Sequence, residues 1–260
     1  SVDLEESDLL LKNLRDTLKK YPSDPVYHHI DRLLDFLTFC YFHKLKLNKK
    51  ASEFFELVNE DIVKFLTYFN LNFFTALFLN MKMERYQRFD HEEKLFEENK
   101  QVIDNINFST NNTAGYVVFT NYLALSAYYA GEYTEALKHI NRLRGRVNIK
   151  KYMIADIDMK LFTALLYALT NEQDLCEQIL GSAKRQIRIF NKKDVRNIRI
   201  FSKIVASTYK PEVYINPELK IRSYVKEFEQ CNKNEFKVMQ YLKLDEKFIN
   251  KILSAAKIKI

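Results

Sequence analysis

Apolar residues recur at three- and four-residue intervals along most of the chain, which is the period of a helix that buries one face. Residues 121–146 show this pattern best, because an apolar stripe precedes Gly131 and a second one follows it. Glycine tolerates the positive φ that a helix end needs. We therefore predict a helix, a turn and a second helix over this stretch. The same period predicts further helices over 3–20, 25–44, 51–68, 70–80, 84–106, 152–170, 174–190, 194–208, 217–231, 234–242 and 245–257.

Polar residues and prolines mark the predicted connections between these helices. The first break is residues 21–25, where Asp24 suits an N-cap and Pro25 suits the first helical position. The longest predicted loop before the central unit gives a candidate internal boundary near residues 107–114. The last predicted helices form a C-terminal capping segment over 217–260, which would cover the end of a stack of helices.

The central unit is repeated forty residues later. Asn171-Glu172 stands where Gly131-Glu132 stands, and small or apolar residues coincide in both helices. The coinciding pairs are Ala124 with Ala164, Ala136 with Cys176, Ile140 with Leu180, and Leu143 with Ala183. Two copies of one unit predict a helical repeat.

The central sequence resembles the tetratricopeptide repeat, and the resemblance is clearest over residues 116–190. In that family a small residue of the first helix packs against an alanine of the second, and a glycine often begins the turn. Ala124, Ala136 and Gly131 stand at these places. Two features depart from the family: the spacing is forty residues rather than about 34, and the closing proline is missing. The longer spacing leaves HEAT-like helix pairs as an alternative.

The resemblance implies an all-α fold: a right-handed α-solenoid of stacked antiparallel helix pairs, forming a single helical-repeat domain over residues 1–260. Such a stack has a concave groove that binds a protein or peptide partner, because helix pairs bury their apolar faces by stacking. In family members that clamp a C-terminal carboxylate, polar residues occupy positions equivalent to Asn121, Leu125, Leu161 and Leu165. Only Asn121 is polar here, so we do not expect that clamp.

Composition narrows the class of protein further. Four glycines and four prolines are too few for many hairpins, and 47% apolar with 29% charged residues argues against disorder. No run of eighteen apolar residues predicts a membrane span, and the acidic N-terminal residues do not resemble a signal peptide. The three cysteines are widely separated, which favours a reducing compartment; we therefore expect a cytoplasmic protein.

Charge is unevenly distributed along the chain. Residues 1–130 hold 15 Lys or Arg against 19 Asp or Glu, whereas residues 131–260 hold 26 against 15. A basic half attracts acidic partners at long range. The residues that we expect to steer an acidic partner are Arg142, Lys184, Arg185, Arg188 and Lys192. Lys184, Arg188 and Lys192 are four residues apart and would form a stripe along one helix face.

Two other interpretations of this basic surface stay open. It could follow phosphates, which makes a nucleic-acid-binding helical repeat that uses residues 138–203 the alternative function. It could also be an ordinary solvated face. For the aromatic residues the choice is similar: Tyr122, Tyr128 and Tyr129 could anchor a ligand or pack between helices.

The sequence indicates no chemistry of its own. The phosphate-loop, dinucleotide and nucleophile-elbow motifs are absent, and the five histidines lack metal-ligand spacing. The acidic run 90–93 suits a helix start without a metal. We therefore expect no catalytic residues, no cofactor and no metal, and a role as a protein-interaction scaffold. The basic amphipathic residues 248–260 suit either a terminal cap or a helix at a membrane surface, and we expect the cap.

Overall fold

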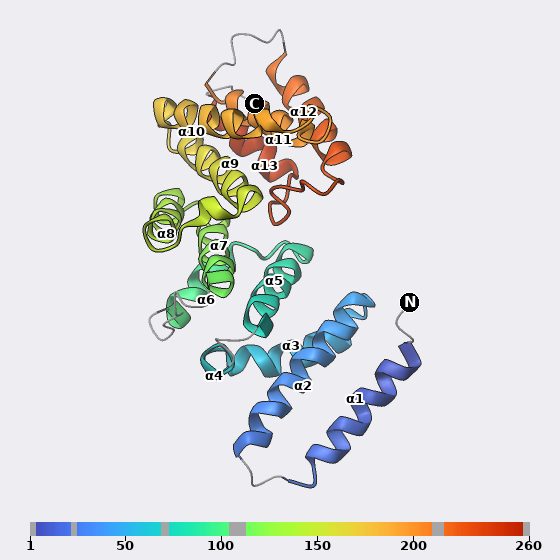
Figure 1. Cartoon of the computed structure of the whole chain (residues 1–260). Coiled ribbons are helices and arrows are strands. Elements are labelled where there is room, and N and C mark those ends of the chain that lie inside the picture. Colours follow the sequence, from blue (N-terminus) through green and yellow to red (C-terminus); the bar gives the residue numbers. More distant parts are fainter. Residues whose placement is uncertain (1–3, 22–24, 69–72, 104–112, 210–215, 257–260) are drawn as a thin grey trace. The chain divides into compact units, whose positions relative to one another are not determined.

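Figure 1 shows a computed structural model of the chain, which describes residues 4–21, 25–68, 73–103, 113–209 and 216–256. These residues form α-helices, short 3-10 helices and no strand, so the all-α prediction is confirmed for them. The α-helices are α1 (Leu4–Leu18), α2 (Pro25–Lys44), α3 (Asn48–Glu60), α4 (Ile62–Tyr68), α5 (Phe73–Arg88), α6 (Lys94–Ile103), α7 (Thr113–Tyr129), α8 (Tyr133–Arg146), α9 (Met153–Leu169), α10 (Gln173–Gln186), α11 (Arg196–Ala206), α12 (Pro217–Cys231) and α13 (Glu246–Ala255). Two 3-10 helices follow α8 and α10, namely η1 (Ile149–Lys151) and η2 (Ile187–Ile189).

Several of the predicted helices differ from the structure. The helix predicted over 51–68 is divided at Asp61 into α3 and α4. The boundary predicted between the helices over 70–80 and 84–106 is wrong, because α5 continues from Phe73 to Arg88 and a turn at Asp90 separates it from α6. Residues 234–242 are not helical. The predicted N-cap Asp24 and most of the predicted boundary at 107–114 lie outside the described residues.

Asparagine side chains explain why the chain after α12 is not helical. The Asn232 side chain donates to the Val238 carbonyl at 2.8 Å and accepts from the Val238 amide at 3.0 Å. The Asn234 side chain accepts from the Phe236 amide at 3.1 Å. Such side-chain bonds compete with helical backbone bonds, so they favour a loop here despite the apolar pattern.

Four helices end in the same kind of turn. Lys46, Asp90, Gly131 and Asn171 all have left-handed backbone, with φ of 59°, 56°, 84° and 63°. In each case the next amide bonds back to a carbonyl five residues earlier. These bonds are Leu47 to Phe42 at 3.0 Å, His91 to Tyr86 at 2.9 Å, Glu132 to Ala127 at 2.9 Å and Glu172 to Tyr167 at 2.8 Å. This is the Schellman ending of a helix, in which a left-handed residue satisfies the last carbonyls.

The turns also have equivalent packing around them. The residues five positions after the left-handed residues are all fully buried: Ala51, Leu95, Ala136 and Cys176. The residues seven positions before are buried as well: Phe39, Met83, Ala124 and Ala164. The left-handed residues are 44, 41 and 40 positions apart. The forty-residue equivalence of the last two units, predicted from Gly131 and Asn171, is therefore present in the backbone.

The chain divides into two compact units. Unit 1 comprises residues 1–85 and 97–119, and unit 2 comprises residues 86–96 and 120–260. Unit 1 has an aromatic core in which Phe36 lies 5.5 Å from Phe65 and 5.6 Å from Phe78, measured between ring centroids. Phe39 joins this core 5.3 Å from Phe55. These rings come from α2, α3, α4 and α5, so they hold the four helices together.

Helix α9 is the centre of unit 2. It contacts α8, α10, α11 and α13, and side chains on all sides of it are buried, which explains why its sequence is apolar all round. α13 begins at Asp245, whose side chain accepts from the Phe248 amide at 3.0 Å. Its apolar residues Phe248, Ile249, Ile252 and Leu253 are buried inside unit 2. These four side chains are therefore not available to a membrane surface.

Candidate basic binding site

A basic pocket lies in unit 2 where α8 ends and α9 and α10 pass beside it. It encloses about 610 Å³. Its lining residues are Arg144, Gly145, Arg146, Val147, Asn148, Ile149, Lys150, Asp156, Lys160 and Ile179. Four of these residues are cationic and one is a carboxylate, so the pocket has a positive balance of charge.

The floor of the pocket is a closed polar network. The Lys160 ammonium donates to Asp156 Oδ2 at 2.7 Å and to Gln186 Oε1 at 2.6 Å. Gln186 Nε2 donates to the same Asp156 oxygen at 2.9 Å. Asp156 is almost fully buried, and the ammonium supplies the charge that a buried carboxylate needs. The network fixes the last turn of α10 against the first turn of α9.

Arg144, Arg146 and Lys150 form the rest of the cationic lining. Within the described part of the chain, none of the three belongs to an ion pair. Burial lowers the pKa of the Arg144 guanidinium, since a half-buried cation has lost part of its hydration. Nearby Asp156 opposes this shift but is already bonded to Lys160. An anion entering the pocket would supply the missing counter-charge.

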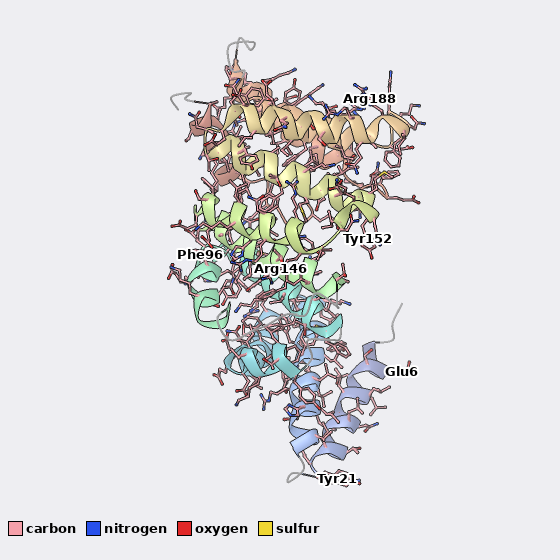
Figure 2. The ribbon with its side chains drawn as sticks, turned by 60° about the vertical axis from the view of Figure 1, so that its left-hand side comes forward. Glu6, Tyr21, Phe96, Arg146, Tyr152 and Arg188 are labelled. Atoms are coloured by element: carbon pink, nitrogen blue, oxygen red, sulfur yellow. The ribbon has the colours of Figure 1, made fainter. Side chains whose placement is uncertain are left out.

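None of the basic residues that the sequence singled out lines this pocket. Lys184, Arg185, Arg188 and Lys192 are exposed, and they form no ion pair within the described residues. Gln186, which bonds to the pocket floor, lies among them. Arg188 projects toward the same side of unit 2 as Tyr152 (Figure 2), which is 57% exposed. The neighbouring Ile189 is 73% exposed.

The predicted stripe along one helix face is wrong in detail. α10 ends at Gln186, the chain tightens into η2, and Phe190 is extended, so Lys192 is not on the helix that carries Lys184. The chain leaves the helix after Gln186 because the Ile187 side chain packs into the core, where it is 1% exposed. Arg142 is exposed on α8 and does not line the pocket.

The three tyrosines considered as anchors are held inside unit 2. Tyr122 and Tyr128 are buried, with exposed fractions of 4% and 1%. The Lys251 ammonium lies 4.3 Å from the centre of the Tyr128 ring, a cation–π contact that fills the face of the ring. In this structure neither ring offers its surface to a partner.

Tyr129 is the centre of a hydrogen-bond cluster. Its hydroxyl accepts from the Lys243 amide at 2.9 Å and from Gln87 Nε2 at 2.8 Å, and donates to the Tyr241 carbonyl at 3.1 Å. Burial raises the pKa of the Tyr129 hydroxyl well above its usual value. The side chain thus ties residues 241–243 to α7, which is a structural role.

The acidic run 90–93 meets lysines of the C-terminal segment. Asp90 pairs with Lys243, and Glu93 pairs with Lys247 at 3.0 Å. Asp90, Glu92 and Asp245 have carboxylate oxygens within 4.8 Å of one another, the spacing of a metal site. The ammonium of Lys243 lies 3.6 Å from Asp245 as well, so the chain's own cation occupies the position beside these acids. The hydrogen bond to Lys243 lowers the pKa of Asp90.

Asp158 is a second acid of this unit, partly buried at a small cavity of about 60 Å³. Its carboxylate accepts from the Met239 amide at 2.7 Å, and Met239 has left-handed backbone with φ of 54°. Burial raises the pKa of Asp158 to about 6, and the hydrogen bond only partly offsets this.

Sequence reasoning missed the residues that give the pocket its shape. Lys160 and Asp156 look like an ordinary pair four residues apart on α9, and Gln186 carries no charge that would draw attention. Arg144 and Arg146 are in the last turn of α8, where cations are expected from the helix dipole alone. Only the packing of α8, α9 and α10 brings these side chains together.

Comparison of the chain with protein-family models, curated proteins and solved structures found no match. Among the helices of the described ranges, none combines the length and apolar character needed to cross a membrane.

Proposed function

We propose that this protein is a non-catalytic helical-repeat module that binds an acidic segment of a partner protein in the basic pocket of unit 2. The observation that carries the proposal is the charge of the pocket: Arg144, Arg146 and Lys150 line it without an ion pair in the described part of the chain. Arginine binds carboxylates through paired hydrogen bonds, which gives an acidic side chain both affinity and orientation.

The four equivalent turns support a repeat architecture for this module. Each joins helices with buried residues at fixed distances before and after the left-handed residue. This regularity is what a solenoid of tetratricopeptide-like helix pairs requires, because every pair has to present the same faces to its neighbours. The proposed architecture is the right-handed stack that the sequence resemblance implies.

Exposed apolar residues favour a protein partner over a nucleic acid. Ile189 and Tyr152 lie near the cations and leave most of their side chains in water. A protein segment with acidic and apolar side chains would use both features, whereas a phosphate backbone would use only the charge. The basic residues after Gln186 also leave the helix, so they lack the regular spacing that favours phosphate tracking. Basic steering by Lys184, Arg185 and Arg188 would raise the rate of association.

The test is a binding titration with a fluorescent peptide of about ten residues, rich in Asp and Glu with two leucines, at two salt concentrations. The pocket variant carries Arg144→Glu, Arg146→Glu and Lys150→Glu. A matched control carries Lys184→Glu, Arg185→Glu and Arg188→Glu, which changes the net charge equally. Because hydrogen bonds to charged groups contribute about 1.5–3 kcal/mol each, we expect the pocket variant to weaken binding at least about tenfold more than the control.

Two outcomes would overturn the proposal. Equal losses in both variants, with binding that vanishes at high salt, would mean that net charge alone attracts the peptide. Tighter binding of a duplex oligonucleotide than of the peptide, with a steep dependence on salt, would favour the nucleic-acid alternative. Far-UV circular dichroism of both variants would establish that they are folded.

A further inference from the structure

Helix α1 uses only one narrow side to contact the rest of unit 1. Between residues 6 and 18, only Ser7, Leu11, Arg15 and Leu18 are partly buried, and no residue in that range is fully buried. These four positions follow helical spacing and form one stripe. Arg15 holds α1 to α2 by pairing with the buried Asp35 at 2.8 Å.

A second apolar side of α1 is left in water. Leu9, Leu10 and Leu14 have exposed fractions of 59%, 55% and 46%. Leu10 and Leu14 are one turn apart, and they help to line a groove of about 490 Å³ between α1 and α2. The lining residues are Glu6, Ser7, Leu10, Leu11, Leu14, Leu37, Cys40, Tyr41, Lys44 and Leu45. Exposed leucines beside an apolar groove mark a surface that binds another protein surface.

The charges beside these leucines indicate which partner surface is complementary to α1. Glu6 is in the first turn of α1, and Lys20 is in the turn that follows Leu18, the last residue of α1. Neither forms an ion pair within the described chain. Residues seven apart lie on the same edge of a helix, so Glu6 and Asn13 share one edge next to Leu10, and Lys20 follows at the next seven-residue step, in the turn after Leu18.

This arrangement is complementary to itself when one copy is reversed. If Leu10 faces Leu14 of a second, antiparallel copy, Glu6 lies level with Leu18 of that copy. Lys20 of the second copy is then two residues further along the chain, in the turn that ends its α1. A two-fold axis makes this contact twice. A parallel pair would place Glu6 beside Glu6 and Lys20 beside Lys20, which is repulsive.

We propose that α1 is a self-association surface through which two copies of this chain pair in antiparallel orientation. Leu10 and Leu14 of both copies fill the centre of the contact, and two Glu6–Lys20 pairs flank it. The surface is small, so the dimer is weak and reversible. It is separate from the proposed function, because α1 belongs to unit 1 and the basic pocket to unit 2.

Sedimentation velocity of the whole chain tests the proposal, over about 1 to 200 µM, the range in which a contact of this size dissociates. We expect a monomer–dimer equilibrium. Glu6→Lys and Lys20→Glu, each made alone, should weaken it about tenfold, because each replaces two attractions by two repulsions. An equimolar mixture of the two variants should dimerise again, since each chain then meets its opposite charge. Lys12→Glu, on the far side of α1, is the matched control and should change nothing.

Three results would refute the pairing. A chain that stays monomeric at the highest concentration has no such surface. A dimer that survives Leu10→Ser with Leu14→Ser uses another surface. Single charge variants whose mixture fails to recover would show that the copies do not pair in this antiparallel register. Because Leu10 and Leu14 are about half exposed, circular dichroism should find these variants folded.

Discussion

Gly131 offers the sharpest test of the turn that the four helix pairs share. Its φ of 84° is in the left-handed region, and a Cβ added there would meet no atom within 4 Å. Gly131→Ala therefore changes the backbone preference without a steric clash. Gly145 is the matched control, because it lies in α8 and also has open space around an added Cβ.

The two substitutions should have opposite signs. An L-residue in left-handed backbone costs roughly 1–2 kcal/mol. Alanine also lowers the conformational entropy of the unfolded chain, which offsets part of this cost, so Gly131→Ala should lower the free energy of unfolding by about 1 kcal/mol. Gly145→Ala should raise it by about 0.5 kcal/mol, because alanine is the better helix former. In a chain of this size the first change corresponds to a fall in Tm of about 2–4 °C.

Urea denaturation followed by circular dichroism measures both changes, and hydrogen exchange at the Glu132 amide reports on the turn itself. That amide bonds to the Ala127 carbonyl at 2.9 Å, so Gly131→Ala should speed its exchange about fivefold or more if the turn opens locally. Equal stability of Gly131→Ala and the parent chain, with unchanged exchange, would mean that the turn is not left-handed in solution. The equivalence of the four turns would then fail.

Three further predictions follow from groups inside unit 2. Burial raises the pKa of Asp158 to about 6, so the folded state binds this proton more tightly than the unfolded state, and stability is lost as pH rises from about 4 to 6. Asp158→Asn should therefore raise the free energy of unfolding at pH 7 by roughly 2–3 kcal/mol. Urea titrations should find no gain in stability below about pH 4. Tyr129→Phe should cost about 1–3 kcal/mol, because it removes the acceptor of the Lys243 amide, whereas the Tyr241 carbonyl keeps its bond from Gln87 at 2.6 Å. Peptide binding at the basic pocket should stay unchanged, and a loss of binding would contradict the structural role. In a thiol titration of the native protein, Cys231 should react first, because Cys40 and Cys176 are buried and burial raises the pKa of each of these two thiols to about 12. Equal reaction rates at all three cysteines would refute this prediction.

The four turns show which features of the backbone the sequence pattern can predict. The glycine at position 131 predicts left-handed backbone there, and the forty-residue offset extends this prediction to Asn171. Lys46 and Asp90 adopt the same backbone, but their residue types do not predict it, because lysine seldom has left-handed backbone and aspartate, although enriched there, more often has other conformations. The apolar pattern therefore predicts one continuous helix across the turn at Asp90.

The candidate site shows the opposite case. The excess of cations after residue 131 could be counted from the sequence, but not the pocket that Arg144, Arg146 and Lys150 line with Lys160. The tyrosines illustrate the same limit, since apolar periodicity does not distinguish a ring in the core from one at the surface. Tyr129 is partly buried because its hydroxyl has three partners, two of which come from a segment more than a hundred residues away.

The residue pattern alone is enough to predict that this chain is helical, where its clearest turn lies and which half is basic. These properties depend on local spacing and on composition, which act through neighbouring residues. The packing of the helices determines which cations share a pocket, which tyrosines are buried and which side of α1 is left in water. Those properties depend on how helices far apart in the sequence pack, because a side chain's exposure and charge environment are set by whatever covers it.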